Sequence, residues 1–354
     1  MAQFISFQPS DFFSTLLYTG TGTSTTFTGV GFQGDFWWGK QWEHTRENRL
    51  FDSVRGAGYY ISSNSTAAQP AQDTTTLSAW TADGFTLGSD GISNVNTGKF
   101  VCWNWKAGTT SGIATNGSTT ITPSSYSFDQ TAGISVLNYT GNITSGAKLA
   151  HGLGATPDFV MIKSLGGTKD WGVYNKGMNK NVDPEDYGLE LNDPAAQDNS
   201  DAYWNDTVPD SVNLTLGNGD KTNYSSGTMV AYCFAEKTGY SKFGTFVGTG
   251  STWGPFIYTG FRPAFVMMKC ATRSGTDDWR LFDDKRLGYN VDNNSLSPNT
   301  TAAERTTDEI DLCSNGFKLR ASATDVNANN DGLIYAAFAE FPLVSSNSIP
   351  GTAR

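Results

Sequence analysis

The sequence is poor in the residues on which metal proteins and many enzymes depend. It has two histidines, His44 and His151, among 354 residues. Its four cysteines lie far apart and form no C-x-x-C pair, which excludes a zinc ribbon and a dense disulfide framework. These cysteines are Cys102, Cys233, Cys270 and Cys313. We therefore expect no metal ion and no cofactor.

Long apolar runs, helical patterns and positive charge are scarce as well. No stretch approaches the roughly 18 apolar residues of a membrane helix, and the first residues lack the basic and apolar regions of a secretory signal. Charged residues make up only 16% of the chain, without the Ala/Glu/Lys-rich composition of a helical bundle. The net charge of −10 and pI of about 4.7 repel phosphate backbones and anionic lipids. We expect neither nucleic-acid binding nor membrane insertion.

Glycine and aromatic residues are abundant. The chain has 39 glycines, and Phe, Tyr and Trp together reach 13%. Disordered chains are poor in aromatics, so this one folds. Alternating strands of 4–8 residues, bounded by Gly, Asn, Asp and Pro, predict an all-β protein.

Five landmarks recur three times in the same order along the chain. An opening aromatic–x–Gly turn lies at 18–20, 139–141 and 246–248. A strand that ends in lysine follows at Gly31–Lys40, Gly154–Lys163 and Gly260–Lys269. An aromatic–polar pair comes next, at 51–52, 174–175 and 282–283. A short alternating strand (85–87, 214–216, 317–319) and an apolar strand (100–105, 229–234, 333–338) close each set.

This repetition predicts three tandem β-sandwich (jelly-roll-like) domains that are diverged copies of one unit, since the spacing of roughly 100–120 residues suits one sandwich. The expected boundaries are an N-terminal anchoring segment 1–16, repeats at 17–108, 134–238 and 239–345, a linker 109–133 and a C-terminal tail 346–354. Asn/Asp-rich insertions at 179–211 and 287–309 are predicted to be surface loops.

Candidate catalytic residues have ordinary structural explanations. His44 lies in a polar connection and His151 precedes a Gly-Leu-Gly turn, and neither has a nucleophile context such as G-x-S-x-G. Acidic clusters at 183–186 and 277–278 could supply the paired carboxylates of a glycosidase, but both are predicted in loops. We therefore expect no catalytic residue and no enzymatic activity.

Residues 325–331 place oxygen-bearing side chains on alternate positions, as a calcium loop does. The sixth position is Asn330 rather than glycine, and the twelfth is Ala336 rather than glutamate. A hairpin connection is the favoured interpretation.

Several aromatics stand in polar or glycine-rich surroundings, where they could stack on a sugar or contact another subunit. The candidate surface or partner contacts are Trp42, Trp80, Trp204, Trp253, Phe7, Phe12 and Phe13.

Three of the recurring elements resemble a repeat domain of virion proteins from marine bacteriophages. The matching stretches are Tyr18–Lys40, His151–Lys163 and Cys102–Gly108, and the opening Phe7–Phe13 is also similar. The resemblance covers nearly the whole chain. It departs at Gly34, where the other repeats have Pro157 and Pro263, and in the third repeat, which lacks the tryptophans of the closing strand.

The resemblance implies a non-enzymatic structural protein of a bacteriophage virion, assembled in the host cytoplasm. The favoured role is a tail-fibre or appendage protein that contacts the host cell surface. A capsid decoration or head-fibre protein, and a polysaccharide-degrading virion enzyme, are the alternatives. The expected partners are further copies of the chain in a homotrimer, other virion proteins of tail or capsid, and a host surface glycan.

Overall fold

The computed structural model describes residues 7–275, 277–286, 290 and 294–341. Its regular structure is nearly all antiparallel strand, which confirms the all-β prediction. The α-helices of this part are single turns, α1 (Asp201–Trp204), α2 (Asp220–Asn223) and α3 (Thr324–Asn327). Short 3-10 turns are η1 (Pro9–Asp11), η2 (Met178–Asn181) and η3 (Pro184–Asp186). None of these helices is long and apolar enough to cross a membrane.

The first sandwich has two sheets. Its inner strands are β1 (Phe13–Thr19), β3 (Phe36–Gln41), β4 (Arg49–Asp52), β5 (Ile61–Ser62) and β8 (Lys99–Trp105), in the order β1-β8-β3-β4-β5. Its outer strands are β2 (Thr25–Thr28), β6 (Leu77–Thr81) and β7 (Gly84–Leu87), in the order β2-β7-β6.

The second sandwich follows the same plan. Its inner strands are β9 (Ser125–Asp129), β10 (Ile134–Thr140), β12 (Phe159–Ser164), β13 (Gly172–Asn175) and β17 (Thr228–Phe234), in the order β9-β10-β17-β12-β13. Its outer strands are β11 (Ala147–Ala150) and β16 (Asn213–Leu216), which pair with each other. A separate hairpin is formed by β14 (Tyr187–Gly188) and β15 (Asp198–Asn199).

The third sandwich repeats it again. Its inner strands are β18 (Ser241–Val247), β20 (Phe265–Cys270), β21 (Arg280–Asp283) and β24 (Gly332–Phe338), in the order β18-β24-β20-β21. Its outer strands are β19 (Phe256–Tyr258), β22 (Ile310–Cys313) and β23 (Gly316–Leu319), in the order β19-β23-β22. The inner sheets thus share one strand order, with the last strand of each unit paired between the first and the lysine-ending strand.

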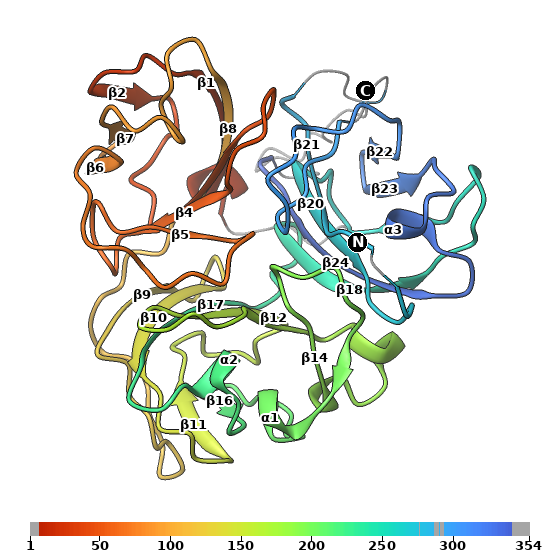
Figure 1. Cartoon of the computed structure of the whole chain (residues 1–354). Coiled ribbons are helices and arrows are strands. Elements are labelled where there is room, and N and C mark those ends of the chain that lie inside the picture. Colours follow the sequence, from red (N-terminus) through yellow and green to blue (C-terminus); the bar gives the residue numbers. More distant parts are fainter. Residues whose placement is uncertain (1–6, 276, 287–289, 291–293, 342–354) are drawn as a thin grey trace.

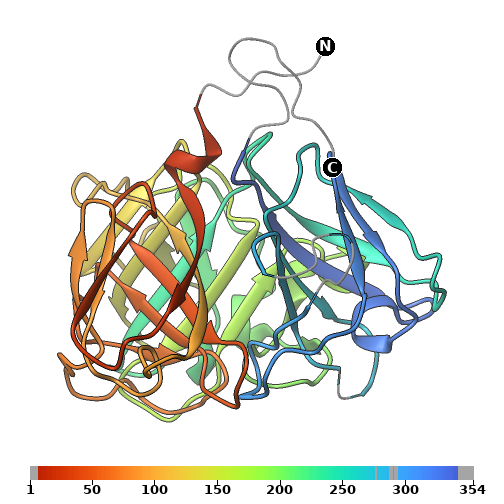
Figure 2. The same ribbon diagram turned by 90° about the horizontal axis from the view of Figure 1, so that it is seen from above.

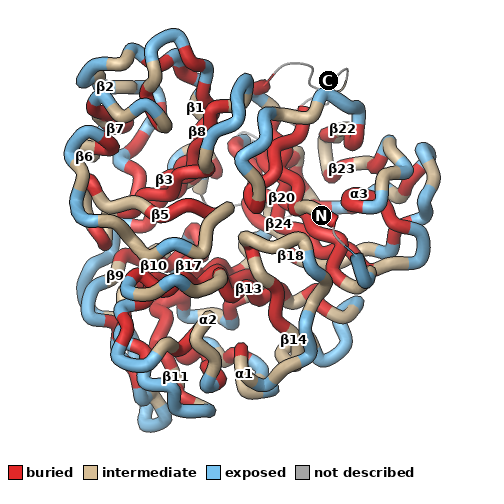
Figure 3. The backbone as a smooth tube through the Cα atoms, in the orientation of Figure 1, coloured by how far each residue is buried: buried red, intermediate tan, exposed pale blue. Residues whose placement is uncertain are grey.

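The three sandwiches form three lobes around a common centre rather than a row (Figure 1). Their inner sheets meet there, and one apolar core contains buried residues from all three lobes. In Figure 3 the buried backbone is concentrated where the lobes meet, and Figure 2 shows the inner strands of the lobes from a second side. Between its own two sheets, each lobe has a further core of its own.

Three aromatic rings join the lobes at the centre. Trp105, Phe234 and Phe338 occupy the same position of β8, β17 and β24, because each pairs with the first residue of the lysine-ending strand. Their ring centroids are 6.2 Å (Trp105–Phe234), 5.5 Å (Phe234–Phe338) and 5.4 Å (Trp105–Phe338) apart, so each ring contacts the other two. Such pairs contribute about 0.5–1.5 kcal/mol each beyond the burial of their area.

The next-to-last residue of β3, β12 and β20 is a buried lysine that reaches the neighbouring lobe. Each Nζ donates a hydrogen bond to a backbone carbonyl of that lobe. The donor–acceptor pairs are Lys40 to Thr301 (3.2 Å), Lys163 to Thr66 (3.0 Å) and Lys269 to Pro194 (2.9 Å). Each Nζ also donates to at least one carbonyl of its own lobe. The cycle is closed, since the first lobe binds the third, the second binds the first and the third binds the second.

The accepting carbonyls belong to equivalent segments, residues 61–66 (which begin with β5), 189–194 and 296–301, which we call the clamp loops. The fourth residue of each clamp loop is an asparagine whose Oδ1 accepts a hydrogen bond from the backbone N–H just before β4, β13 or β21. These bonds run from Asn48 to Asn64 (2.8 Å), from Trp171 to Asn192 (2.8 Å) and from Trp279 to Asn299 (3.1 Å). Two segments predicted to be surface loops therefore supply contacts between lobes.

The side chains of the same three donors cross to the neighbouring lobe. Asn48 donates to the carbonyl of Thr300 (2.9 Å), Trp171 to that of Ser62 (3.2 Å) and Trp279 to that of Glu190 (3.0 Å). Every lobe is thus fixed to the next by a lysine and by a second side-chain donor.

Part of the predicted linker 109–133 belongs to the second lobe. Residues 125–129 form β9, and Ile121 is buried in the core between the sheets of that lobe. The alternation of Tyr126 and Phe128 explains the strand. Within the predicted anchoring segment 1–16, β1 already begins at Phe13. Residues 1–6 of that segment and the predicted tail 346–354 lie outside the described residues.

Replacing Lys163 with methionine should lower the free energy of unfolding by about 2–4 kcal/mol. The substitution removes the three hydrogen bonds that the buried Nζ donates to the carbonyls of Thr66, Ser164 and Lys169, at roughly 1 kcal/mol each. Urea unfolding measures the change. The matched control is Lys99→Met, because Lys99 is 54% exposed and pairs with an exposed glutamate, so a change of less than about 1 kcal/mol is expected. Equal effects of the two substitutions would contradict a stabilising role for the hydrogen bonds of the Lys163 Nζ.

The three buried lysines also predict that the stability of the fold rises with pH. Burial lowers the pKa of Lys40 from 10.5 to about 7, so between these values the folded chain binds fewer protons than the unfolded chain. The free energy of unfolding should therefore increase from pH 7 to pH 9, by at most about 1.4 kcal/mol per pH unit for this group. Burial lowers the pKa of Lys163 and Lys269 to about 8, which adds in the same direction.

Urea unfolding at pH 6, 7, 8 and 9 tests this, with Lys40→Met as the comparison. The variant should show a smaller increase than the wild type between pH 7 and pH 9. An identical pH dependence in both proteins would show that Lys40 keeps its ordinary pKa.

Candidate functional site

The outer sheet of the third lobe carries exposed aromatic residues. Phe256 and Tyr258 alternate with buried Ile257 along β19, so both aromatic side chains face solvent. They are 45% and 60% exposed. Trp253, three residues before Phe256, is 78% exposed. We call Trp253, Phe256 and Tyr258 the aromatic platform.

The register of the sheet places charged and small residues beside these rings. Phe256 pairs with Lys318, which pairs with Asp311, so the three stand in one row. In the next row, Tyr258 pairs with Gly316. A Cβ atom at Gly316 would lie 2.8 Å from Cζ of Phe256, so the glycine leaves room for the ring to lie across the sheet.

Two cations hold Trp253 near the sheet. The Nζ of Lys318 lies 5.9 Å from the Trp253 ring centroid and the guanidinium carbon of Arg320 lies 5.7 Å away, both within cation–π range. Lys318 also donates to the carbonyl of Gly254 (2.7 Å), and Arg320 pairs with Asp311 (3.0 Å). A Cβ atom at Gly254 would lie 2.5 Å from Cβ of Leu319, so only glycine lets the Trp253 loop approach β23 this closely.

This arrangement can bind another molecule by non-covalent contacts alone. Exposed aromatic rings stack on the apolar face of a sugar or pack into a protein pocket, and the neighbouring charges offer hydrogen bonds. Trp, Tyr and Arg are also the residues that dominate binding energy at interfaces. The aromatic platform is therefore the candidate contact surface of the described chain.

Among the seven predicted contact residues, Trp253 is exposed and belongs to the platform. Trp42, Trp80, Phe7 and Phe12 are half-buried and pack against the apolar cores. They present only part of their surface to a partner.

Trp204 and Phe13 are buried core residues, which corrects their prediction as surface contacts. Trp204 ends α1 and packs edge-to-face on Tyr174, at 5.7 Å. Phe13 opens β1 opposite Trp105 and stacks on Phe338, at 5.7 Å. Their polar sequence surroundings did not reveal this because the packing partners lie in distant strands or in another lobe.

The two histidines have different surroundings. His151 is fully buried, with Nε2 donating to the carbonyl of Asp210 (3.0 Å) and Nδ1 accepting from the N–H of Leu153 (3.2 Å). Burial lowers its pKa, so the ring is neutral and fixes a turn. His44 is exposed and lines an open recess of about 450 Å³, together with Arg46 and Asn96.

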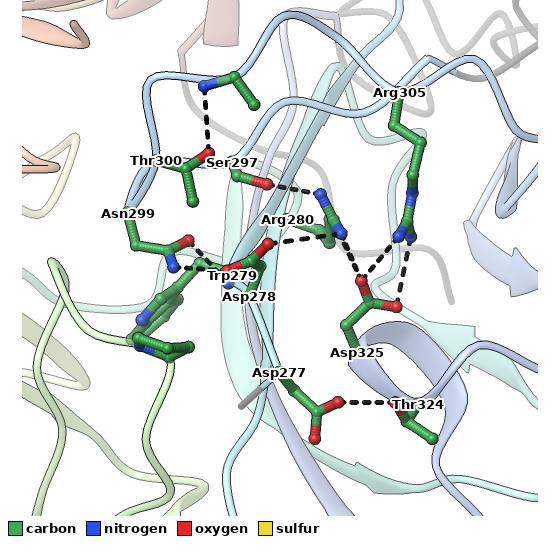
Figure 4. Close-up of polar contacts among 12 residues, drawn as sticks. Asp277, Asp278, Trp279, Arg280, Ser297, Asn299, Thr300, Arg305, Thr324 and Asp325 are labelled. Carbon is green, nitrogen blue, oxygen red and sulfur yellow. Dashed lines mark hydrogen bonds and ion pairs between the residues drawn. The ribbon is translucent and has the colours of Figure 1, made fainter. Parts of the chain in front are cut away.

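The carboxylates of the acidic cluster 277–278 form ion pairs and hydrogen bonds with neighbouring side chains (Figure 4). Asp277 pairs with Arg273 (2.8 Å) and accepts from Thr324 (2.6 Å), while Asp278 accepts from Asn299 (2.8 Å). In the cluster 183–186, Asp183 is exposed and directly precedes η3, and the half-buried Glu185 and Asp186 belong to that turn.

Residues 325–331, for which a hairpin connection is favoured over a calcium loop, join β23 and β24 of two different sheets, so the hairpin interpretation is wrong. The segment begins with an aspartate that faces cations. Asp325 lies in α3 and its carboxylate pairs with Arg280 (2.5 Å) and Arg305 (3.0 Å) (Figure 4). Within the described part of the chain, no group of three or more His, Cys, Asp or Glu side chains is placed to hold a metal ion.

Phe256 and Tyr258 were not predicted as contact residues. The signal in the sequence was the short alternation Phe-Ile-Tyr after Pro255, which indicates a strand with two aromatics on one face. That this face points to solvent follows only from the position of β19 in the outer sheet.

A family model described as "Domain of unknown function (DUF7483)" matches residues 8–342. The match spans all three lobes, in agreement with their shared core. Neither the comparison with curated proteins nor that with solved structures gives a match.

Replacing Asp325 with asparagine should lower the free energy of unfolding by about 3 kcal/mol, because Arg280, which is nearly buried, loses the nearer of its two carboxylate partners and keeps only Asp278, at 3.8 Å. Chemical unfolding measures it, with Asp220→Asn as the control, since Asp220 is 42% exposed in its pair with Lys169. The control should change stability by less than about 1 kcal/mol. Calcium should leave the Tm of the wild type unchanged. A calcium-dependent rise in Tm that Asp325→Asn abolishes would show that residues 325–331 bind calcium.

Proposed function

The chain belongs to this family of unknown function, and we propose that it is a non-enzymatic structural protein of a bacteriophage virion. Its role is that of a tail-fibre or appendage protein that contacts the host cell surface through the aromatic platform. The exposure of Phe256 and Tyr258 on one outer sheet, and of Trp253 in the loop that leads into it, is the observation that carries the contact role.

The resemblance of the repeats to virion proteins of marine bacteriophages supports the setting. The fold supports it as well, because a virion protein has to keep its shape outside the cell. Three lobes that share one core and are fixed to each other by buried donors provide such rigidity.

The chemistry of the platform favours a glycan over an anionic surface of lipid or nucleic acid. The chain carries a net charge of −10, which repels both of these partners. The platform itself combines three aromatic rings with Lys318, Arg320 and the carboxylate of Asp311. Rings stack on sugar C–H faces, while both signs of charge accept or donate hydrogen bonds to hydroxyl groups.

The arrangement of the lobes bears on the expected homotrimer. The inner sheets already meet three-fold within one chain, so an oligomer would have to use other surfaces. Many copies on one particle, whatever their contacts, turn weak glycan binding into strong attachment.

Replacing Trp253 with alanine should weaken binding to surface polysaccharide at least 10-fold, because a central exposed tryptophan often supplies more than 1–2 kcal/mol at a contact. The full chain is applied to an array of bacterial surface polysaccharides, and the variants Trp253→Ala and Tyr258→Ala are compared with it. The control is Phe341→Ala, a 57% exposed aromatic outside the platform. Equal binding by all four proteins would contradict the contact role.

The position in the particle is tested separately, by gold-labelled antibody on intact virions in the electron microscope. Label at the tail is expected. Label spread over the head would contradict the appendage role and favour capsid decoration.

A further inference from the structure

The pseudo-symmetry of the lobes places three equivalent positions next to each other in every lobe. The first opens β4, β13 or β21 and is Arg49, Gly172 or Arg280. The second is the second residue of the clamp loop, namely Ser62, Glu190 or Ser297. The third stands two residues before a buried asparagine that accepts a hydrogen bond from the opening turn of the lobe.

These asparagines establish the equivalence of the third position. The Oδ1 atoms of Asn94, Asn223 and Asn327 accept from the backbone N–H of Thr21 (2.9 Å), Asn142 (2.7 Å) and Thr249 (2.8 Å). The third position is therefore Ile92, Lys221 or Asp325.

In the third lobe the positions are filled by an ion pair (Figure 4). Nε and Nη2 of Arg280 both donate to Oδ2 of Asp325, at 2.8 and 2.5 Å, and Nη1 donates to Oγ of Ser297, at 2.5 Å. One edge of the guanidinium thus binds a carboxylate from α3.

In the second lobe a pair of opposite polarity fills the same positions. Lys221 donates to the carboxylate of Glu190 and to the hydroxyl of Tyr203 (2.8 Å). Gly172 replaces the arginine, and a Cβ atom there would lie 2.8 Å from Cγ2 of Thr222. Both lobes therefore close the site with their own side chains.

In the first lobe the arginine is present and the carboxylate of the third position is missing. Arg49 is 5% exposed and its guanidinium carbon lies 3.7 Å from the ring centroid of Tyr60. Its Nε is buried and forms no hydrogen bond. Ile92 stands where the third lobe has Asp325, and Arg49 and Ile92 line one cleft of about 230 Å³.

Among the described residues, the carboxylate paired with Arg49 is that of Glu47, which lies 3.3 Å from Nη1 and is 39% exposed. It does not occupy the Nε side of the guanidinium. A nearly buried arginine that lines an open cleft, without the carboxylate that the third lobe supplies from its own chain, is the arrangement that binds a carboxylate from outside.

We propose that this cleft binds a small hydroxylated carboxylic acid of the uronic-acid class. The ligand carboxylate binds the guanidinium of Arg49 from the cleft, as the carboxylate of Asp325 binds that of Arg280 in the third lobe. The cleft is smaller than the roughly 300–1,000 Å³ that drug-sized ligands occupy, so it suits a single sugar-sized ring.

The remaining lining fits such a ring. Glu47, Ser62 and Ser65 offer oxygen atoms for hydroxyl groups, while Ile92 and Pro70 offer an apolar wall for the C–H face. The inference stands on the comparison of the three lobes and does not depend on the virion role or on the aromatic platform.

Calorimetric or NMR titration of the full chain with glucuronate tests the proposal, with glucose as the uncharged comparison. Saturable binding of glucuronate, at least 10-fold tighter than that of glucose, is expected. Arg49→Gln should weaken it at least 10-fold, since the charged donor is lost. Absence of glucuronate binding in the wild type would overturn the proposal.

Ile92→Asp provides a second test that does not remove the arginine. It places a carboxylate of the chain itself where the third lobe has one, so glucuronate binding should fall at least 10-fold while the fold is retained. Ile92→Asn is the matched uncharged control and should bind more tightly than Ile92→Asp. Unchanged binding of glucuronate by Ile92→Asp would show that the acid binds elsewhere and would overturn the proposal. Binding of N-acetylglutamate to the wild type as tight as that of glucuronate would overturn the assignment to a sugar acid.

Discussion

Burial of the central strands on both faces is the constraint on which this structure depends. β3, β12 and β20 are buried along their whole length, each between the core of its own lobe and the core shared by all three. An inner sheet of one isolated lobe would leave the aromatic triangle of Trp105, Phe234 and Phe338 exposed to water. The three lobes are therefore parts of one cooperative body, and the match of one family model to residues 8–342 agrees with this.

The same constraint explains the hydrogen bonds that the buried lysines form between lobes. A lysine in or beside a strand that is buried on both faces cannot reach water, so its Nζ has to find acceptors inside the protein. Backbone carbonyls of the clamp loops provide them, and because each loop belongs to the neighbouring lobe, the bond also fixes the orientation of the two lobes. A polar residue that would weaken an isolated sheet thus gives the assembly its specific geometry.

Outside the shared core, the lobes have diverged. The positions next to the clamp loops hold an Arg–Asp pair in the third lobe, a Lys–Glu pair in the second and an arginine beside an open cleft in the first. Exposed aromatics are likewise concentrated on the outer sheet of the third lobe. The core positions are constrained by packing against two neighbours, whereas the periphery is free to acquire separate binding surfaces.

The sequence by itself determined the strand content and the threefold recurrence of landmarks, because alternation, turn residues and repeated motifs are local patterns. It also singled out Lys40, Lys163 and Lys269 and the exposed Trp253. Tertiary structure decided the rest. The contacts of the lysines, the burial of Trp204 and Phe13 and the outward face of β19 depend on which strands from distant parts of the chain pack together. The ring of lobes instead of a row follows from inner sheets that are apolar on both faces, a property of the assembled sheets that no single segment displays.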